Sequence, residues 1–545
     1  MDIAPWSPPS SPKSNSNPSL STIAPYLPPT CLPLPSLSIS KKNANSKPKP
    51  GLLINTHLSR GELPLIRILI EKNGWKEVYT DGDIIWSGLS LPEEEFFFSE
   101  GIKANRIPGM KDLAHKKTTG FFLNKFREYF KEEYDFFPRT FLYPEETEIF
   151  EDYMKKKGGV YIVKPTSGSQ GDGIYIINKF GQLRERYFNK GEEMVIQEYI
   201  DNPLLVGGKK FDIRLYVAIV SVEPLVTMIC SEGLARFATE EYQKVSKENI
   251  NEVYRHLTNY SLNKMSANYV YTEELFEINN ASKRTLTSLW KELSMMGIDV
   301  EEILKRIDEL VQKFMKSMQF FMLYNYKAAY GNNTHGDCFH VLGFDILLDE
   351  NLKPWILEIN NNPSLNIYHE DESNPDKKLK KNISKISPLD LHVKSMVVED
   401  TLKIMAMSNE KKLNVAKEGS FNSFRKILIE DNEENEKDIF GTILEVFGKL
   451  GGYKFKSTIN ASRFKKLASL TGMTNQVFTK NDYDLLWTRM LRNNYDSKNM
   501  DFYDFIRTFE ELAKKLIAEF SVQDKFPAVY KLTAMIKNQI NNLII

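Results

Sequence analysis

Short alternating runs of apolar residues and longer runs at helical spacing predict where strands and helices lie along the chain. From Gly51 the sequence reads as the strand LLINTHL, the helix PLIRILIEKNGW, and then the strand-forming segment KEVYTDGDIIWSG. Period-two and period-3.6 apolar patterns that follow one another in this way are typical of α/β structure. The pattern therefore predicts a small α/β domain near the start of the folded chain.

The middle of the chain is predicted to mix both kinds of element. Sequence between Lys111 and Lys157 is mostly helical, the strands VYIVKP and GIYIIN follow, and strands and helices mix to about residue 405. The segment WKELSMMGIDVEEILKRIDELVQKFMKSMQFF carries apolar residues at helical spacing, which indicates a core helix. We therefore expect a second and larger α/β region.

Two stretches lack any apolar pattern, and a third carries a diverged motif. Residues 1–50 are rich in Pro, Ser and Asn, which predicts a disordered tail, and the acidic run EDNEENEKD at 430–438 predicts a solvated linker. Beyond it, NNYDSKNMDFYDF resembles a calcium loop, but Tyr495 stands at a ligand position and Lys498 replaces the turn glycine. We expect a degenerate EF-hand-like helical pair that serves packing.

Composition limits the class of protein without naming its function. At 545 residues the chain exceeds a single core, and its 41% hydrophobic content is that of a globular protein. The 72 basic and 72 acidic residues cancel, which gives no overall attraction to nucleic acid or membrane. Three dispersed cysteines and the absence of a long apolar run or signal peptide favour a cytosolic protein that neither crosses a membrane nor is secreted.

Charged residues interrupt otherwise apolar strands, and burying such charges without partners is costly. In LGFDILL, Asp345 lies between apolar residues; in PWILEINNNPS, Glu358 and Asn360 share one strand face. The turn LDENLKP between the strands predicts an antiparallel hairpin that brings the three side chains together. Two carboxylates and an amide oxygen suit Mg²⁺, although an ion-paired or half-exposed hairpin would show the same spacing.

Two further segments carry side chains suited to a nucleotide. In KKFDIRLYVAIV, Lys210, Asp212 and Arg214 alternate with apolar residues, as they would on an edge strand with a wet face or on the wall of a nucleotide cleft. In VYIVKPTSGSQGDGIYII, Lys164 ends a strand and a glycine-containing loop leads into another strand. Strand, loop and strand suit a flap over phosphate, and they suit an ordinary glycine hairpin equally well.

The segments VIQEYID and HLTNYSLNK are weaker signals. In the first, a short apolar strand leads into Gln197, Glu198 and Tyr199, whose backbone is suited to an adenine edge. The second is a polar cluster for which a capped turn is the simple structural explanation, and His256 within it has the features of a satisfied core residue.

Taken in order, several motifs resemble the tubulin tyrosine ligase-like family. They are VKPTSGSQGDGI, IQEYI, GGKKFDIRLYV, EGLARFATEEY, HLTNYSLNK, LGFDILLDENLKPWILEIN and LDLHVK. The resemblance covers roughly Leu52 to Ile404 and implies an α/β ATP-grasp fold with nucleotide held between two lobes. With the flanking patterns it divides the chain as follows: tail 1–50, N-terminal α/β domain 51–110, central lobe 111–215, C-terminal lobe 216–405, linker 406–440 and helical extension 441–545.

The resemblance also assigns site residues by position. It implies ATP contacts at Lys164, Gln170, Gly171, Gln197, Glu198, Tyr199, Ile200, Lys210, Asp212, Thr258 and Asn259. It implies magnesium ligands at Asp345, Glu358 and Asn360, and contacts with the incoming amino acid at Arg236, Tyr260, Ser261, Lys283 and Lys394. Arg236, Lys210 and Glu358 are the expected catalytic residues.

Within the family, EGLARFAT and HLTNYSLNK resemble the glutamate-adding branch. That branch implies phosphoryl transfer from ATP to a glutamate side chain of a tubulin C-terminal tail, giving an acylphosphate that the amine of free glutamate attacks. The implied partners are tubulin or microtubules and free glutamate. The implied protein is a monomer of the cytoplasm and cytoskeleton, at cilia or basal bodies.

Tubulin tails are acidic, so a basic docking surface is expected. The candidates lie after the strand that carries Glu358 and Asn360, and they are Lys377, Lys378, Lys380, Lys381 and Lys385. Such a run is also typical of a solvated face. Two alternatives stay open, a glycine ligase and an inactive microtubule-binding scaffold. The scaffold is favoured by Gln170 and Asp172, which stand where the family usually carries arginine, and the strand NNNPS also departs from the usual single asparagine.

Overall fold

The structure is a computed structural model, and it describes most of the chain from Gly51 onward. The described residues are 51–88, 103–168, 171–183, 192–330, 338–370, 384–430, 439–450, 458–471, 479–491 and 499–520, with a few positions between 529 and 536. The predicted tail lies outside them, as do Gln170, most of the acidic linker, and Tyr495 and Lys498 of the calcium-like loop.

The first α/β unit is a parallel sheet with one helix. Its four strands run in the order β2-β1-β3-β4, and they are β1 (Leu53–Asn55), β2 (Lys76–Val78), β3 (Ile84–Ile85) and β4 (Lys103–Ala104). Helix α1 (Leu63–Asn73) connects β1 to β2 and ends at Gly74, whose positive φ of 65° suits a residue without a side chain. The strand and helix predictions for this segment are confirmed.

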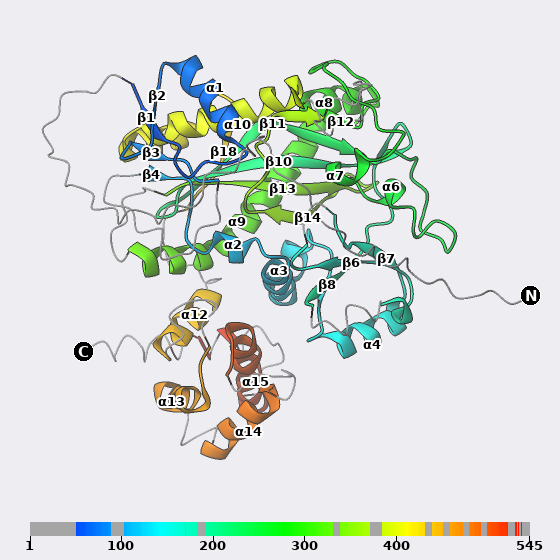
Figure 1. The fold of residues 1–545 in the computed structure, drawn as a ribbon. Coiled ribbons are helices and arrows are strands. Elements are labelled where there is room, and N and C mark those ends of the chain that lie inside the picture. The colour runs from blue at the N-terminus through cyan, green and yellow to red at the C-terminus, as the bar shows by residue number, and fades with distance from the viewer. Residues whose placement is uncertain are drawn as a thin grey trace, which may run out of the picture. The chain divides into compact units, whose positions relative to one another are not determined.

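A second sheet of four antiparallel strands follows, in the order β5-β8-β6-β7 (Figure 1). The strands are β5 (Thr140–Tyr143), β6 (Tyr161–Pro165), β7 (Tyr175–Ile177) and β8 (Met194–Glu198). Helix α4 (Thr147–Lys157) covers the face that carries Phe141, while α3 (Lys116–Phe130), which follows the short α2 (Met110–Leu113), packs on the face that carries Leu142. Strand, loop and strand around Lys164 is thus the observed arrangement.

The largest sheet among the described residues has eight antiparallel strands. Its main path is β14-β13-β10-β11-β18-β17, with β9 paired to β10 and β12 to β11. The strands are β9 (Leu205–Val206), β10 (Lys209–Ser221), β11 (Leu225–Phe237), β12 (Lys283–Thr285), β13 (His340–Leu348), β14 (Pro354–Asn360), β17 (Ser420–Phe421) and β18 (Phe424–Glu430). The expected lobe boundary at residue 215 therefore falls inside β10.

Helices cover both faces of this sheet. Ile213, Leu215 and Val217 of β10 enter the core on the side of α9 (Val300–Tyr330), whereas Tyr216 and Ala218 enter the core shared with α1 and α10 (Pro388–Ala406). Because strand side chains alternate between faces, β10 is buried on both sides and reads as a nearly continuous apolar run. The remaining elements near the sheet are α6 (Val253–His256), α7 (Tyr260–Asn263), α11 (Asn409–Glu418), β15 (Tyr368–Glu370) and β16 (Ser384–Ile386).

The long core helix expected near Trp290 is in fact two helices, α8 (Leu286–Met295) and α9. The break has a local cause: Gly297 adopts a left-handed φ of 80°, and the side chain of Asp299 accepts a hydrogen bond from Glu302 N at 3.1 Å. A left-handed glycine ends one helix and an Asp cap begins the next. The prediction of core helix is confirmed for both helices, whose apolar faces are buried, and the sequence pattern did not indicate the break between them.

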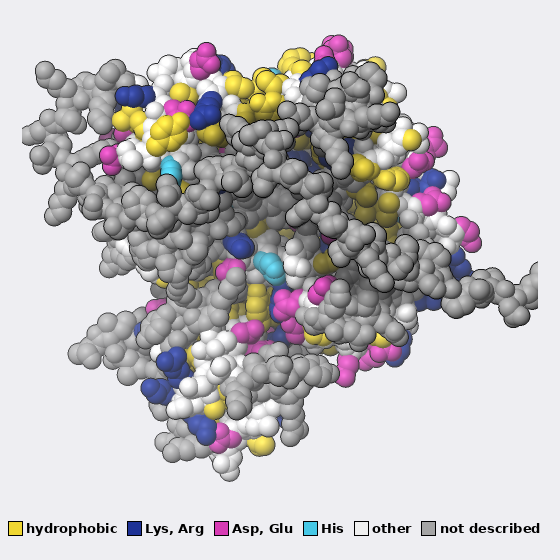
Figure 2. Space-filling model, viewed as in Figure 1, with side chains coloured by type: hydrophobic (Ala, Val, Ile, Leu, Met, Phe, Trp, Pro, Cys, Tyr) yellow, Lys and Arg dark blue, Asp and Glu magenta, His cyan; other side chains and the backbone are white. Residues whose placement is uncertain are grey.

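Within the described residues from 439 to 520, the helices are α12 (Ile439–Lys449), α13 (Ala461–Thr471), α14 (Lys480–Leu491) and α15 (Phe502–Phe520). The described part of the predicted extension 441–545 is mainly helical, and its status as a separate domain stays a prediction. No helix in the described part of the chain is both long and apolar enough to cross a bilayer. On the face drawn in Figure 2, acidic and basic side chains are interspersed, in keeping with the balanced charge of the chain.

Candidate active site

The predicted hairpin of β13 and β14 is present and aligns its polar residues. Asp345 lies directly opposite Glu358, and Asn360 lies opposite Gly343. Asn360 Nδ2 approaches Asp345 Oδ2 at 3.3 Å. The sequence prediction that these three side chains converge is confirmed. A register shift between Asp345 and Ile346 sets the alignment, because the register next to the turn would place Asp345 opposite Leu357.

Strand β10 brings the charged face of KKFDIRLYV against the same hairpin. Arg214 lies opposite Asp345 and donates to both of its oxygens, from Nε at 2.5 Å and Nη2 at 3.0 Å. On the other side, Asp212 lies opposite Arg236 of β11, whose Nε and Nη2 donate to it at 2.6 and 2.8 Å. Arg236 Nη2 also lies 2.9 Å from Asp345 Oδ2, so the buried Asp212, Arg236 and Asp345 form one network with the half-buried Arg214.

This network sets the ionisation of Asp345. Burial by itself would raise the pKa of the carboxyl, but the guanidinium groups of Arg214 and Arg236 outweigh that effect and hold the pKa well below its usual range. Asp345 is therefore a carboxylate at neutral pH. Thr258 adds a hydroxyl to the same cluster, donating to Asp212 Oδ2 at 2.5 Å.

Lys164 joins the smaller sheet to the larger one. From the end of β6 its Nζ donates to Gln197 Oε1 on β8 at 2.7 Å and to the carbonyl of Leu357 on β14 at 3.3 Å. Gln197 in turn donates to Thr140 Oγ1 on β5 at 3.0 Å. A cavity of about 20 Å³ lies between the sheets, lined among others by Lys164, Gln197 and Glu358.

Lys210 is the second buried lysine of the site. Its Nζ lies 4.1 Å from the centre of the Tyr199 ring and donates to the Tyr199 hydroxyl at 3.0 Å. Burial lowers the pKa of Lys210 to about 7 and that of Lys164 to about 8. His256 contacts the same tyrosine at 3.2 Å and the carbonyl of Asn249 at 3.1 Å, and burial lowers its pKa to about 4. His256 is thus the satisfied core residue that the sequence suggested.

The glycine loop after β6 approaches two other parts of the site. A side-chain carbon at Gly171, where φ is 88°, would lie 3.3 Å from Asn259 Cγ, so glycine permits the loop to touch the HLTNYS segment. Lys116 of α3 donates to the carbonyl of Gly168 at 2.7 Å and pairs with Glu358 at 3.3 Å. Two predicted nucleotide residues, Gly171 and Asn259, are therefore neighbours.

Not every predicted nucleotide residue points toward the cluster. Glu198 faces α4, where its carboxylate accepts hydrogen bonds from Tyr153 and Lys157, both at 2.8 Å. The backbone amides of Glu198 and Tyr199 are bonded within the lobe, to the carbonyls of Arg139 and Val160. Ile200 follows directly and is half-buried.

The predicted amino-acid residues form a second cluster beside the first. Lys283 on β12 lies opposite Arg236 and pairs with Asp390 of α10 at 2.5 Å, while Lys394, one turn along α10, pairs with Asp390 at 2.9 Å. Lys283 Nζ also lies 4.3 Å from the centre of the Tyr260 ring. Ser261 follows Tyr260 in α7 and is half-buried.

Three residues of these clusters were missed by sequence reasoning. Arg214 was on the predicted charged face but received no role. Asp390 could have been found from its spacing to Lys394, because residues four apart on a helix are neighbours. Lys116 offered no signal, since its partner Glu358 is remote in the sequence. Of the expected docking lysines, only Lys385 is described; it is exposed on β16, and the other four lie outside the described residues.

The donor chemistry of the hairpin fits a magnesium ion shared with a polyphosphate. In the described residues no group of three or more His, Cys, Asp or Glu side chains is placed to hold a metal. A site at Asp345 and Glu358 would therefore depend on oxygens from a ligand, which is how Mg²⁺ is usually bound beside phosphates. The surrounding Lys116, Lys164, Lys210, Arg214 and Arg236 outnumber Asp212, Asp345 and Glu358 when all are ionised, which favours an anion.

Comparison with known proteins identifies the family of this chain. The model of the tubulin-tyrosine ligase family matches residues 99–415, more than half of the chain. Tubulin polyglutamylase TTLL11 of Homo sapiens is 35% identical over 388 residues, covering 69% of this chain and 53% of the relative. Tubulin polyglutamylase TTLL6 of Mus musculus is 33% identical over 375 residues, covering 68% and 42%.

A third relative is matched over a smaller share of its own length. The probable beta-tubulin polyglutamylase of Tetrahymena thermophila is 36% identical over 340 residues, covering 61% of this chain and 26% of the relative. The chain spans about half the length, or less, of these curated relatives. The match by the family model and the order of the motifs along the paired strands lead to one conclusion: this chain is a member of the tubulin-tyrosine ligase family.

Proposed function

We propose that the chain is an ATP-dependent ligase that adds glutamate to the side-chain carboxylate of glutamate residues in tubulin C-terminal tails. The observation that carries the proposal is the cluster that joins two sheets. Lys164 donates to the Leu357 carbonyl next to Glu358, and the charges of Glu358 and Asp345 act on Lys164 as that of Asp212 acts on Lys210. The excess of positive charge in the cluster suits a triphosphate. The names of the relatives, which are tubulin polyglutamylases, supply the acceptor and the added amino acid.

In this proposal the two sheets are the lobes of an ATP-grasp fold. Lys164, Lys210, Thr258 and Asn259 hold the phosphates, with Gly171 beside Asn259 and the Gln197–Ile200 segment at the base. Gln170, which lies outside the described residues, is assigned to the phosphates by the family resemblance. Buried lysines suit this task because they are already desolvated and held in place, so little reorganisation accompanies binding. Asp212 fixes Arg236 and Thr258 at the wall of the cleft.

Asp345, Glu358 and Asn360 are proposed to hold magnesium. A bound Mg²⁺ would neutralise charge on the phosphate oxygens during transfer to the acceptor carboxylate. Arg214 keeps Asp345 ionised and oriented, and Lys116 pairs with Glu358. Transfer of the γ-phosphoryl group gives an acylphosphate with a good leaving group, which the amine of glutamate displaces.

The incoming glutamate is proposed to bind at Lys283, Lys394, Tyr260 and Ser261, next to Arg236. Asp390 lies between the two ammonium groups, so a carboxylate is already accommodated there. Arg236 has the fork geometry that grips a carboxylate with two bonds, and in the structure that fork is engaged by Asp212. A substrate carboxylate at Arg236 would have to share the guanidinium with Asp212. The acidic tubulin tail implies a cytoskeletal setting, with Lys385 as one docking residue.

Incorporation of labelled amino acids into purified microtubules, with ATP and Mg²⁺, tests the proposal. Glutamate labelling is expected in the wild-type chain and should be lost in Glu358→Gln, which keeps the size of the side chain and removes its charge. Glu350→Gln is the matched control, because Glu350 lies in the turn of the same hairpin and is exposed. Labelling by glycine instead of glutamate, or labelling that survives in Glu358→Gln, would contradict the proposal.

A further inference from the structure

The four C-terminal helices form a module that the proposed function does not use. They comprise residues 439–520, beyond the stretch that matches the family. Two helix-loop-helix units, α12 with α13 and α14 with α15, are joined by an antiparallel bridge in which Ile459 and Met500 exchange backbone hydrogen bonds of 2.9 Å. This is the pairing expected of an EF-hand-like unit. We call residues 439–520 the C-terminal module.

The C-terminal module packs along one face of α3. Tyr503 of α15 stacks edge-on against Phe121 with ring centres 5.0 Å apart, and its hydroxyl hydrogen-bonds to Thr118 Oγ1 at 2.8 Å. Phe440 of α12 packs against Phe122 and Phe126 at 5.4 and 5.1 Å. These positions of α3 follow helical spacing, so a whole stripe of the helix is covered by the module.

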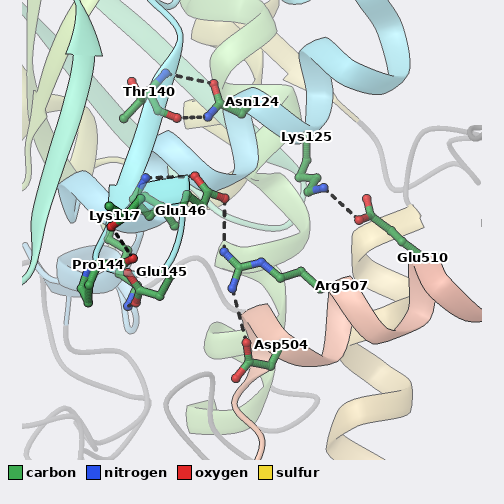
Figure 3. Close-up of polar contacts among 12 residues, drawn as sticks. Lys117, Asn124, Lys125, Thr140, Pro144, Glu145, Glu146, Asp504, Arg507 and Glu510 are labelled. Atoms are coloured by element: carbon green, nitrogen blue, oxygen red, sulfur yellow. Dashed lines mark hydrogen bonds and ion pairs between the residues drawn. The ribbon is translucent and has the colours of Figure 1, made fainter. Parts of the chain in front are cut away.

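Glu510 provides the main polar link. One carboxylate oxygen accepts a hydrogen bond from Tyr129 at 2.5 Å and the other pairs with Lys125 at 2.9 Å, as Figure 3 shows for the lysine. Glu510 is buried, and these two partners offset part of the cost of burying its carboxylate. A neighbouring residue, Glu511, pairs instead with Lys514 of its own helix.

A second link reaches β5. Arg507 of α15 donates to Glu146 at 3.2 Å, and the other oxygen of Glu146 accepts from Leu142 N at 2.9 Å (Figure 3). Asn124 of α3 is hydrogen-bonded to the backbone of Thr140, whose hydroxyl accepts from Gln197. The module therefore holds both α3 and the strand that supports Gln197.

The start of α3 is part of the active site. Lys116 lies two residues before Thr118, and it contacts the Gly168 carbonyl and the Glu358 carboxylate. A rigid helix transmits position along its length, so the placement of Lys116 depends on how the rest of α3 is held. Helix α3 therefore contacts the glycine loop at its first turn, and the C-terminal module packs against its following turns.

We propose that the C-terminal module is a positioning element of the nucleotide site. It holds α3 so that Lys116 is placed between the phosphate loop and Glu358, and Glu510 and Tyr503 are its positioning residues. The inference rests on the proposed nucleotide site and concerns its affinity for ATP. This role would explain why the C-terminal module packs against the proposed ligase domain.

The test compares nucleotide binding by the full chain with Glu510→Ala and with the control Glu511→Ala, using a fluorescent ATP analogue and Mg²⁺. Glu510→Ala should weaken binding about tenfold, in line with coupling energies between sites joined by packed elements. Glu511→Ala should bind as the wild type does. In turnover, the KM for ATP should rise in Glu510→Ala while the KM for glutamate stays unchanged, a split that general loss of stability would not produce.

Two further variants complete the design. The charge exchange Lys125→Glu with Glu510→Lys should restore much of the affinity, because it rebuilds the pair. If Glu510→Ala does not fold, Tyr503→Phe, which removes only the hydroxyl that contacts Thr118, should weaken binding about threefold. Folded variants that bind nucleotide as Glu511→Ala does would overturn the proposal. A wild-type chain that binds ATP but adds no glutamate would defeat the proposed function alone, and one that binds no ATP would defeat both.

Discussion

Arg214 and Asp345 face each other across β10 and β13 and are joined by two hydrogen bonds of 2.5 and 3.0 Å. Both side chains are almost enclosed, with exposed fractions of 13% and 7%. A bidentate pair in such surroundings fixes the orientation of the carboxylate that is proposed to bind magnesium. The relationship has a consequence for stability, because removing one member leaves the other charge buried.

Replacing Arg214 with methionine is expected to lower the free energy of unfolding by about 3 kcal/mol, since Asp345 would keep only Arg236 as a cationic partner. Arg306→Met is the control: Arg306 forms an exposed pair with Glu302, and its loss should cost less than about 0.5 kcal/mol. Urea unfolding measures both. If both variants lost the same free energy of unfolding, the pair of Arg214 and Asp345 would contribute no more than the exposed pair, which would contradict the prediction.

Nucleotide affinity should fall as the pH rises above neutrality. Burial lowers the pKa of Lys210 to about 7 in the free protein, and a bound phosphate would favour the charged form and raise that pKa. Binding then takes up a proton when the pH lies above 7, so affinity decreases with pH by at most about tenfold per unit for this group. Titrations with ADP between pH 6 and 9 measure the slope.

Calorimetry in buffers of different ionisation enthalpy should report the same proton uptake. In Lys210→Arg the group stays charged over this range, so the slope should become shallower, and the remaining dependence should come from Lys164, whose pKa is lowered to about 8 by burial. A wild-type affinity independent of pH would contradict the assignment of Lys210 to the phosphates.

Removing one lysine of the second cluster should act on the amino acid and not on ATP. Lys394→Met leaves Asp390 paired with Lys283 but removes one ammonium from the pocket. The KM for glutamate is expected to rise about 50-fold, the effect of losing a charge-assisted contact of about 2.3 kcal/mol, with the KM for ATP unchanged. Lys403→Met on the same helix, where Lys403 pairs with Glu399, should change neither constant.

Acidification should stabilise the C-terminal module near α15. Burial, and then the neighbouring Asp501, raise the pKa of Asp504 to about 6. A carboxyl whose pKa is higher in the folded chain than its unfolded value of about 3.9 binds protons more readily when folded. Above pH 6, burying the ionised Asp504 carboxylate therefore lowers the free energy of unfolding. This loss disappears as the pH falls from 6 to 4.

Asp504→Asn should remove this contribution and raise the unfolding midpoint at pH 7, by about 2 to 4 °C for a gain of about 1 kcal/mol. The difference from wild type should shrink at pH 4. Thermal unfolding at both values of pH measures it. A destabilised variant at pH 7 would mean that the contact of Asp504 with Arg507 outweighs the cost of burying its charge.

The sequence by itself determined the elements of the site that lie within one hairpin or one strand. The turn after Asp345 allows one short connection, so Glu358 had to lie near it, and strand alternation placed Lys210, Asp212 and Arg214 on one face. The glycine loop between β6 and β7 was recognisable for the same reason. Local geometry is enough to predict these arrangements because the residues concerned lie close together in the sequence.

Tertiary structure alone decided which of these elements meet. It brought Lys116 to Glu358, placed Lys283 against Asp390, committed the fork of Arg236 to Asp212, and set Glu510 against α3. Each contact joins segments far apart in the chain, and its geometry depends on how whole helices and sheets pack. Periodicity identifies which face of an element is buried, but the partner of that face is chosen by the packing of the complete fold.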